Sequence, residues 1–286
     1  MSIFRASGTA APAIMVIVNV TPDSFSDGGK LSSAEAALAH ALQLVDQGAH
    51  ILDIGGESTR PGASPIPADE ELARVISLIT ALRAQWDGPI SIDTMKPGVA
   101  RAAVAAGATM WNDVTALSHS PHSPQTAADL RCDLVLMHMR GVPRTMQQAP
   151  AYEDVVSDVI DWLGARAEEA IAAGVDRDRI WLDPGIGFGK TPDHNLALTA
   201  GLQRLAVLGF PILFGASRKR LIESVDSTAT DPLDRLGGSI ALALEAVRQG
   251  ADIIRVHDVR ETAQALRMQA ALRSAATSDV AATTGL

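Results

Sequence analysis

Acidic and amide residues close several short hydrophobic runs of this chain. Asp93, Asn112 and Asp183 do so in SIDT, WNDV and LDPG. Carboxylates that face a protein interior need hydrogen-bond donors, because an unpaired buried charge is costly. Either a metal or a ligand with several N–H groups would supply them. Two carboxylates with one amide look less like a complete metal shell than like an edge for an aminated heterocycle, since an amide both donates and accepts.

Other residues could complete a site for such a ligand. Met137 and Phe188 could form surfaces for a flat ring, although core packing explains both residues as well. Lys219, in GASRKRLI at the apparent start of a helix, could donate to a ligand carbonyl or ring nitrogen. The helix N-terminus and Arg220 could attract a carboxylate, while a solvated basic cluster is the other interpretation.

A second group of residues suits an anion. The glycine-rich turn GGESTRPG carries Thr59 and Arg60 as donors. Arg255 and His257 stand two apart on the last hydrophobic run, so they share one face of a strand. Hydroxyl, guanidinium and imidazole side chains of this kind indicate a phosphate site, although an ordinary surface turn also explains the glycine-rich segment.

An early loop could hold a cation beside that anion. Asn19 opens the loop NVTPDSFSDGG, in which Asp23 and Asp27 offer carboxylate oxygens. Hard cations such as Mg²⁺ prefer oxygen ligands. Phosphate with magnesium is therefore the natural pair, and an ordinary surface turn is again the alternative.

All these residues lie on or after short hydrophobic runs that recur about every 34 residues, a spacing that suits a strand, a loop and a helix. The runs are residues 14–18, 51–54, 90–92, 109–111, 134–137, 180–182, 211–214 and 252–256. Amphipathic segments lie between them, among them residues 33–47, 69–85, 97–106, 152–173 and 232–249. Alternating units without a composition break predict an α/β protein with one domain, a TIM (β/α)₈ barrel.

Helix ends are marked in the same pattern. Gly48, Gly107, Gly174 and Gly250 stand where a helix C-cap glycine belongs. Ser32 with Glu35 could form a capping box. We expect an N-terminal extension over residues 1–13, the barrel over 14–273 and a frayed or disordered tail over 274–286, which is rich in Ala, Ser and Thr.

A barrel would bring the carboxyl ends of its strands to one mouth, where function should lie. The polar residues at run ends are Asn19, Asp53, Asp93, Asn112, His138, Asp183, Ser217, Arg255 and His257. A strand-end cap explains any one of them. The whole set points to a site.

Composition excludes several classes of protein. The 286 residues are 47% hydrophobic, 20% charged and 3% aromatic, with a net charge of −9, so we expect a globular chain without nucleic-acid affinity. Cys132 is the single cysteine, which excludes an intramolecular disulfide and favours a reducing compartment. The N-terminal apolar run is interrupted by Pro12 and Asn19, so we expect neither a signal peptide nor a membrane segment, and a cytoplasmic location.

Eight motifs in order give the chain a family resemblance. They are NVTPDSFSDGG, DIGGESTRPG, SIDTMKPGVA, GATMWNDV, LMHMRGVPRTMQ, DPGIGFGKTPDHNL, FGASRKR and IIRVHDV. From about residue 14 to residue 268 the chain resembles the dihydropteroate synthases. The resemblance implies a TIM barrel that joins 6-hydroxymethyl-7,8-dihydropterin diphosphate to 4-aminobenzoate, with pyrophosphate and dihydropteroate as products in folate biosynthesis. Homodimers and competition by sulfonamides for the aminobenzoate site are further properties of that family.

The resemblance also implies roles for individual residues. The pterin-recognising set is Asp93, Asn112, Asp183 and Lys219, with Met137, Phe188 and Gly215 as pocket walls. Asn19 matches the magnesium-associated asparagine, and the diphosphate contacts are Thr59, Arg255 and His257. Those expected around aminobenzoate are Phe25, Pro61, Ser217 and Arg220. The loops with Asp27 and Arg60 would order once diphosphate is present, which implies that pterin diphosphate binds before aminobenzoate.

The departures from the family pattern are small. Met95 stands where an aromatic residue is common, and NDVTAL and RKRLIES replace glycine-containing versions. One alternative function is a barrel that transfers a methyl group from a reduced folate to a corrinoid protein, which has no need of the diphosphate and aminobenzoate motifs. Another is a non-catalytic pterin-binding paralogue, in which the loop motifs should be eroded.

Overall fold

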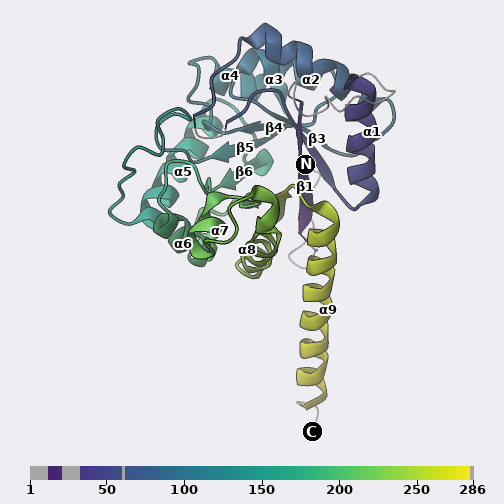
Figure 1. Ribbon diagram of the computed structural model, residues 1–286. Coiled ribbons are helices and arrows are strands. Elements are labelled where there is room, and N and C mark those ends of the chain that lie inside the picture. The colour runs from purple at the N-terminus through teal and green to yellow at the C-terminus, as the bar shows by residue number, and fades with distance from the viewer. Residues whose placement is uncertain (1–11, 21–32, 60–61, 284–286) are drawn as a thin grey trace.

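Strands and helices alternate along the described residues, 12–20, 33–59 and 62–283 of a computed structural model (Figure 1). The strands are β1 (Ala13–Asn19), β2 (Ile51–Gly55), β3 (Ile90–Asp93), β4 (Met110–Asp113), β5 (Asp133–Met137), β6 (Ile180–Asp183), β7 (Leu213–Phe214) and β8 (Ile253–Val256). The helices are α1 (Ser33–Asp46), α2 (Ala68–Arg83), α3 (Pro97–Ala105), α4 (Ser123–Leu130), α5 (Val155–Ala172), α6 (Pro192–Ala200), α7 (Arg220–Val225), α8 (Leu236–Arg248) and α9 (Val259–Thr283), with short 3₁₀ helices η1 (Arg177–Arg179), η2 (Leu202–Leu208) and η3 (Pro232–Arg235). Each predicted run is confirmed as a strand. The segment predicted as one helix over 232–249 is instead η3 followed by α8.

The strands form a nearly closed barrel. In the described residues all eight are parallel, in the order β6-β5-β4-β3-β2-β1-β8-β7. The two edges meet through a parallel bridge between Leu182 and Ile212, and the Leu182 amide donates to the Pro211 carbonyl at 3.0 Å. The helices surround the strands in Figure 1. The predicted TIM barrel is confirmed.

An apolar plug fills the interior of the barrel on the side towards the amino ends of the strands. It consists of inward-facing residues from seven strands: Met15, Ile51, Met110, Val135, Trp181, Leu213 and Ile253. Their strand neighbours, such as Leu52 and Leu182, belong to the larger core that includes the helices. Side chains alternate between the two faces of a strand, so the residue two positions beyond a plug residue also faces inward, one layer nearer the mouth.

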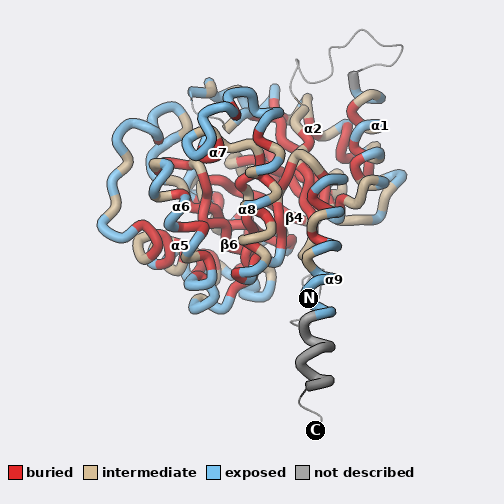
Figure 2. The backbone as a smooth tube through the Cα atoms, turned by 60° about the horizontal axis from the view of Figure 1, so that its bottom comes forward, coloured by how far each residue is buried: buried red, intermediate tan, exposed pale blue. Residues whose placement is uncertain are grey.

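Burial follows this layered arrangement. Buried segments occupy the centre of the molecule and exposed ones its outside in Figure 2. The helices return to the strands through the predicted C-cap glycines, since Gly48, Gly107, Gly174 and Gly250 have φ values of 112°, 119°, 105° and 98°. Only glycine adopts this backbone region without strain. Ser32, the expected capping residue, lies outside the described residues.

The last helix is longer than the sequence predicts. α9 continues to Thr283, through most of the segment whose composition predicts a frayed or disordered tail, and its end projects from the barrel in Figure 1. The alanine-rich composition of this segment suits a helix, because alanine has the highest helix propensity. Residues 1–11 lie outside the described part of the chain. No described helix is long and apolar enough to span a membrane.

Trp181→Ala tests the plug. We expect the variant to lose about 3–5 kcal/mol of unfolding free energy, because the fully buried indole leaves a cavity that the closed barrel cannot fill. Urea denaturation measures the loss. Val207→Ala, at a side chain that is 79% exposed, is the control and should stay within about 0.5 kcal/mol. A loss at residue 181 as small as that of the control would contradict the role of the plug.

Candidate active site

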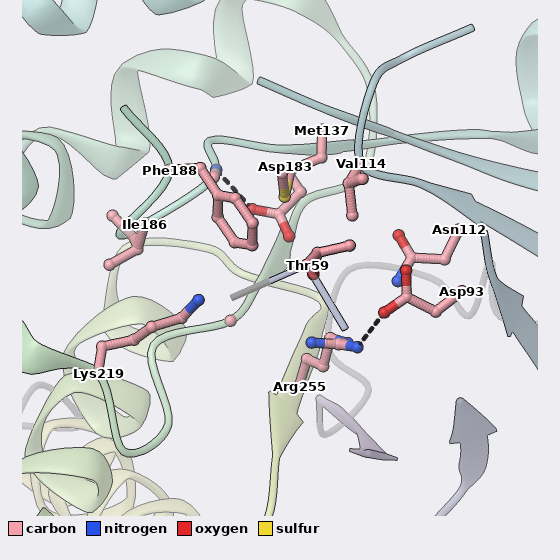
Figure 3. A pocket seen from close by; sticks show the side chains of 12 residues that line it. Thr59, Asp93, Asn112, Val114, Met137, Asp183, Ile186, Phe188, Lys219 and Arg255 are labelled. Atoms are coloured by element: carbon pink, nitrogen blue, oxygen red, sulfur yellow. Dashed lines mark hydrogen bonds and ion pairs between the residues drawn. The ribbon is translucent and has the colours of Figure 1, made fainter. Parts of the chain in front are cut away.

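A pocket opens at the mouth of the barrel, above the plug (Figure 3). It is lined by Thr59, Asp93, Asn112, Val114, Met137, Asp183, Gly185, Ile186, Phe188, Gly215, Lys219 and Arg255. Several of these residues stand two positions beyond a plug residue: Asn112, Met137, Asp183, Gly215 and Arg255. The register of the strands therefore places side chains from distant parts of the sequence in one layer.

Arg255 joins two carboxylates at the base of this pocket. Its Nε donates to Asp53 Oδ2 at 2.7 Å, and its Nη2 donates to Asp93 Oδ2 at 2.6 Å, the contact drawn in Figure 3. Asn112 Nδ2 also donates to Asp53 Oδ2, at 3.2 Å. Burial lowers the pKa of Arg255, but Asp53 and Asp93 outweigh burial and raise the pKa above its ordinary value. The guanidinium is therefore a permanent charge that ties β2, β3 and β8 together.

Asp93 keeps one oxygen for a ligand. Burial raises the pKa of this carboxyl group to about 7, because the attraction of Arg255 offsets only part of the desolvation and Asp53 adds repulsion. Asp93 Oδ1 is buried and has no hydrogen-bond partner among the described residues. An acceptor in this state is stabilised by a ligand N–H group, which would also favour the ionised form.

Asp183 lies on the other side of the pocket. Its Oδ1 accepts a hydrogen bond of 2.7 Å from the backbone N–H of Gly185. Burial raises the pKa of Asp183 to about 6, against the opposing effects of the Gly185 amide and Arg255. Two buried carboxyl groups with raised pKa values line one pocket, which makes this pocket the candidate functional site.

Apolar side chains line the pocket between the carboxyl groups of Asp93 and Asp183. Phe188 and Met137 belong to one small cluster with Val114, so they line the pocket and also pack against each other. Lys219 Nζ lies 4.2 Å from the centre of the Phe188 ring, within range of a cation–π interaction. A side chain at Gly215 would place Cβ 3.5 Å from Arg255 Cβ and 3.9 Å from Asp183 Oδ2, so glycine keeps this wall thin.

Other predicted site residues lie beside the pocket or away from it. His257 Nδ1 lies 3.0 Å from Ser217 Oγ, which also accepts from the His257 amide at 3.2 Å. Asn19 Oδ1 borders Gly55, which pairs in register with Asp93. The Arg220 side chain is 86% exposed and pairs with Glu223 outside the pocket. The remaining candidates lie outside the described residues: Phe25, Asp27, Arg60 and Pro61.

A buried ion cluster fastens the loop that carries Thr59. Lys96 Nζ donates to Glu57 Oε2 at 2.7 Å and to Glu71 Oε2 at 2.6 Å, and Glu57 Oε1 accepts from the Ile66 amide at 3.1 Å. Burial lowers the pKa of Lys96, but its hydrogen bonds to the two carboxylates raise the pKa above its usual value. This cluster ties the start of the β2–α2 loop to α2 and to the end of β3.

The sequence patterns assign no role to several residues of this site. The patterns place Asp53 at a strand end, whereas in the structure Asp53 orients Arg255 by accepting a hydrogen bond from its Nε. A charge inside the fully buried strand Ile51–Gly55 is the signal for such a partner, because a carboxylate in that position requires a cation. Val114, Gly185 and Ile186 line the pocket without any polar signal that could identify them in the sequence.

Comparisons with known proteins agree with this site. A family model described as "Pterin binding enzyme" matches residues 15–257. The dihydropteroate synthase of Neisseria meningitidis serogroup C is 49% identical over 268 residues, which are 93% of this chain and 94% of that protein. The Xanthomonas albilineans dihydropteroate synthase with 4-aminobenzoic acid superposes with a TM-score of 0.86 at 51% identity, covering 92% of this chain and 93% of that one. The same enzyme in complex with 7,8-dihydropteroate gives a TM-score of 0.83 at 48% identity, covering 92% and 94%.

Asp183→Asn tests the electrostatic cost of the pocket. Because burial raises the pKa of Asp183 from 3.8 to about 6 on folding, the native state binds a proton at this carboxyl group more tightly than the unfolded state does. The free energy of unfolding therefore falls as the pH rises from 3.8 to about 6. Asparagine carries no charge, so we expect the ligand-free variant to melt above the wild-type protein at about pH 8. The gain should be roughly 2–4 °C for each kcal/mol recovered.

The same comparison at about pH 3 is the internal control, because Asp183 is then mostly protonated in both the native and the unfolded protein and the charge-dependent difference in melting temperature should largely disappear. A difference that is the same at both pH values would show that the effect is one of shape and not of charge.

Proposed function

The chain belongs to the pterin-binding enzyme family and, within it, to the dihydropteroate synthases, and on that basis we propose the substrates and the division of labour in its pocket. The reaction joins 6-hydroxymethyl-7,8-dihydropterin diphosphate to 4-aminobenzoate and releases pyrophosphate and 7,8-dihydropteroate. The observation that carries this proposal is a buried carboxylate, Asp93, in a pocket that Phe188 also lines: among the described residues one of its oxygens has no hydrogen-bond partner, and the other accepts from a guanidinium.

The pterin occupies the inner pocket. Its N–H groups donate to Asp93 Oδ1 and to Asp183, while Asn112 can donate and accept at the same edge. The ring lies against Met137 and Phe188. Burial of the two carboxyl groups supports this assignment, because ligand N–H groups compensate for the water that the carboxylates lose.

Charge separation along the pocket favours bond breaking. Loss of diphosphate from the pterin methylene leaves positive charge on the pterin and adds negative charge to the leaving group. The Asp93 carboxylate stabilises the first, and the guanidinium of Arg255, bonded to that carboxylate, stabilises the second. Thr59 and His257 bind the diphosphate, with the His257 ring oriented by Ser217. Lys219 lies over Phe188, between the pterin and the outer site.

Magnesium would bind at the diphosphate. Asn19 Oδ1, beside Gly55 at the mouth, is an oxygen ligand suited to this ion. Within the described ranges no group of three or more His, Cys, Asp or Glu side chains could hold a metal, and the candidate ligands Asp23 and Asp27 lie outside those ranges. Bound at the diphosphate, the ion would neutralise part of the charge on the leaving group.

Aminobenzoate occupies the outer pocket. The family resemblance assigns Phe25 and Pro61, which lie outside the described residues, to its ring, and Ser217 to its carboxylate end. The exposed Arg220 side chain would have to turn away from Glu223 to reach that carboxylate. Sulfonamides are expected to compete in this outer pocket. The amine requires placement more than activation, because the pterin methylene is the electrophile. We expect ordered addition, with pterin diphosphate binding before aminobenzoate; Asp27 and Arg60, which the resemblance assigns to this order, lie outside the described residues.

We further propose a cytoplasmic homodimer. Apolar side chains on late elements that contact one another, Leu196 of α6, Val225 of α7 and Leu233 of η3, are exposed in the single chain and support pairing through this side of the barrel. Burial raises the thiol pKa of Cys132, the single cysteine, to about 12, which fits an unreactive packing residue in a reducing compartment.

The direct test is release of pyrophosphate. Protein incubated with pterin diphosphate, magnesium and 4-aminobenzoate should release pyrophosphate and form dihydropteroate, and omission of aminobenzoate should abolish the product. Folded protein that binds pterin without this reaction would indicate a non-catalytic paralogue. Methyl transfer from a methylated folate to a corrinoid protein would indicate the other alternative.

Asp93→Asn tests the transition-state role of this carboxylate. Asparagine keeps the shape and an acceptor oxygen but removes the charge, so we expect kcat to fall by about 100-fold or more while the Kd of pterin diphosphate rises by less than about tenfold. Steady-state kinetics and titration measure the two quantities. Asp133→Asn, which alters a buried carboxylate at the start of β5 and away from the mouth, is the matched control. Equal losses in turnover and affinity would assign Asp93 to ground-state binding alone.

A further inference from the structure

Lys190 is a buried lysine that faces no ligand. It lies in the loop between β6 and α6, and only 2% of its surface is exposed. Its Nζ lies 2.8 Å from His138 Nδ1 and donates to the carbonyls of Gly185 at 2.9 Å and Phe188 at 3.1 Å. The His138 carbonyl lies at 3.3 Å. The ion pairs found among the described residues include none to this ammonium.

The three short contacts match the ammonium group. An ammonium has three N–H donors and no acceptor, and it meets one imidazole nitrogen and two carbonyls. Burial lowers the pKa of His138 to about 2, and the charge of Lys190 contributes to this lowering, so the imidazole is neutral and Nδ1 can accept. Burial also lowers the pKa of Lys190, to about 7, which is the electrostatic cost of placing this charge inside the loop.

The loop is shaped around this contact. Gly185, Gly187 and Gly189 all have positive φ values, of 67°, 82° and 64°. A Cβ at Gly185 would lie 1.9 Å from the His138 carbonyl oxygen, and one at Gly189 would lie 2.3 Å from the Arg140 carbonyl oxygen. The glycines thus let the loop lie directly against the chain that leaves β5, with carbonyls turned towards Lys190.

This loop forms one side of the pterin pocket. Gly185, Ile186 and Phe188 line the pocket, and the Gly185 amide orients the carboxylate of Asp183, as Figure 3 shows. Phe188 is held from two sides, since its carbonyl accepts from Lys190 and its ring meets Lys219. A change at Lys190 therefore reaches the pocket through backbone atoms and without any direct ligand contact.

We propose that Lys190 is a positioning residue for pterin binding, whose ammonium gathers the His138, Gly185 and Phe188 acceptors and so fixes the Phe188 wall and the Asp183 carboxylate. The proposal rests on the proposed function for its ligand. The proposal gives the two lysines different roles: Lys219 lines the pocket, and Lys190 holds the loop that forms one side of the pocket. Aminobenzoate binds on the outer side and should depend less on this loop.

Lys190→Met tests the proposal, because methionine keeps a similar length and removes every donor. We expect the Kd of pterin diphosphate to rise by about tenfold or more, since two buried carbonyls and an imidazole nitrogen lose their donor. At saturating pterin diphosphate, the Michaelis constant for aminobenzoate should change by less than about threefold. Hydrogen exchange of the backbone amides of residues 183–191 should become faster.

Tyr152→Phe is the matched control. It removes one neutral hydrogen bond of 2.8 Å from the tyrosine hydroxyl to the Gly189 carbonyl of the same loop, and it leaves the acceptors around Lys190 intact. We expect it to change pterin affinity by less than about threefold. If Lys190→Met does not fold, His138→Phe removes one acceptor while keeping a ring against Trp162, and it should raise the pterin Kd in the same direction.

The two proposals fail separately. Wild-type protein that binds no pterin diphosphate would refute the proposed function, whereas the exchange of residues 183–191 would still measure the effect of Lys190 on its loop. A folded Lys190→Met variant with wild-type pterin affinity would overturn the positioning role. Equal increases in the pterin Kd and in the Michaelis constant for aminobenzoate would also overturn it, because they would indicate general loosening of the barrel.

Discussion

The two ion pairs of Arg255 are the interaction on which the mouth of this barrel depends. The guanidinium bonds to Asp53 and Asp93, which lie on two other strands, and the contact to Asp53 joins residues 202 positions apart. Breaking a buried pair by removing one partner is far more damaging than the pair is stabilising, because an uncompensated charge is left behind. Arg255 therefore allows acidic residues to stand together above an apolar plug. Without that cation, the carboxylates in this layer would have to take up protons or draw water into the barrel.

The plug and the polar layer follow from one repeat. A strand presents every second residue to the interior. In the layer next to the mouth, Asp53 therefore lies above Ile51, Asp183 above Trp181 and Arg255 above Ile253. Each of these three strands thus supplies an apolar residue for stability and a charged residue for the pocket layer. The closed barrel holds both in one register, because a slip of one residue would place the polar group among the helices and the outer core. The residue that stabilises the barrel and the residue that lies in the pocket layer are thus two positions apart on the same strand.

This repeat also explains which features could be predicted from the sequence. The strands, the C-cap glycines and the polar residues at strand ends are local patterns, and so the barrel and the pocket residues Asp93, Asn112, Asp183 and Arg255 follow from them, whereas Gly215 is implied only by the family resemblance. The pairing of Asp53 with Arg255 and the contacts of Lys190 are not predictable, because they join segments that are distant in sequence and depend on side-chain direction. The exposure of Arg220 escapes prediction for the same reason, since a basic residue after a strand can face either the pocket or the solvent. α9 continues through most of the segment for which the sequence predicts an irregular tail, because alanine-rich composition suits helix as well as coil.

The distribution of cations resolves the conflict between an acidic protein and anionic substrates. The net charge of −9 is spread over the whole chain, and at physiological ionic strength exposed charges are screened over about 8 Å. Arg255 and Lys219 act within the pocket, where low polarity strengthens their effect on a bound diphosphate or pterin. Lys96 and Lys190, by contrast, direct their charge at glutamates, an imidazole and carbonyls inside the loops. The described lysines are thus divided between the pocket, which Lys219 lines, and the loops around it, and local placement rather than net charge sets the electrostatic potential at the mouth.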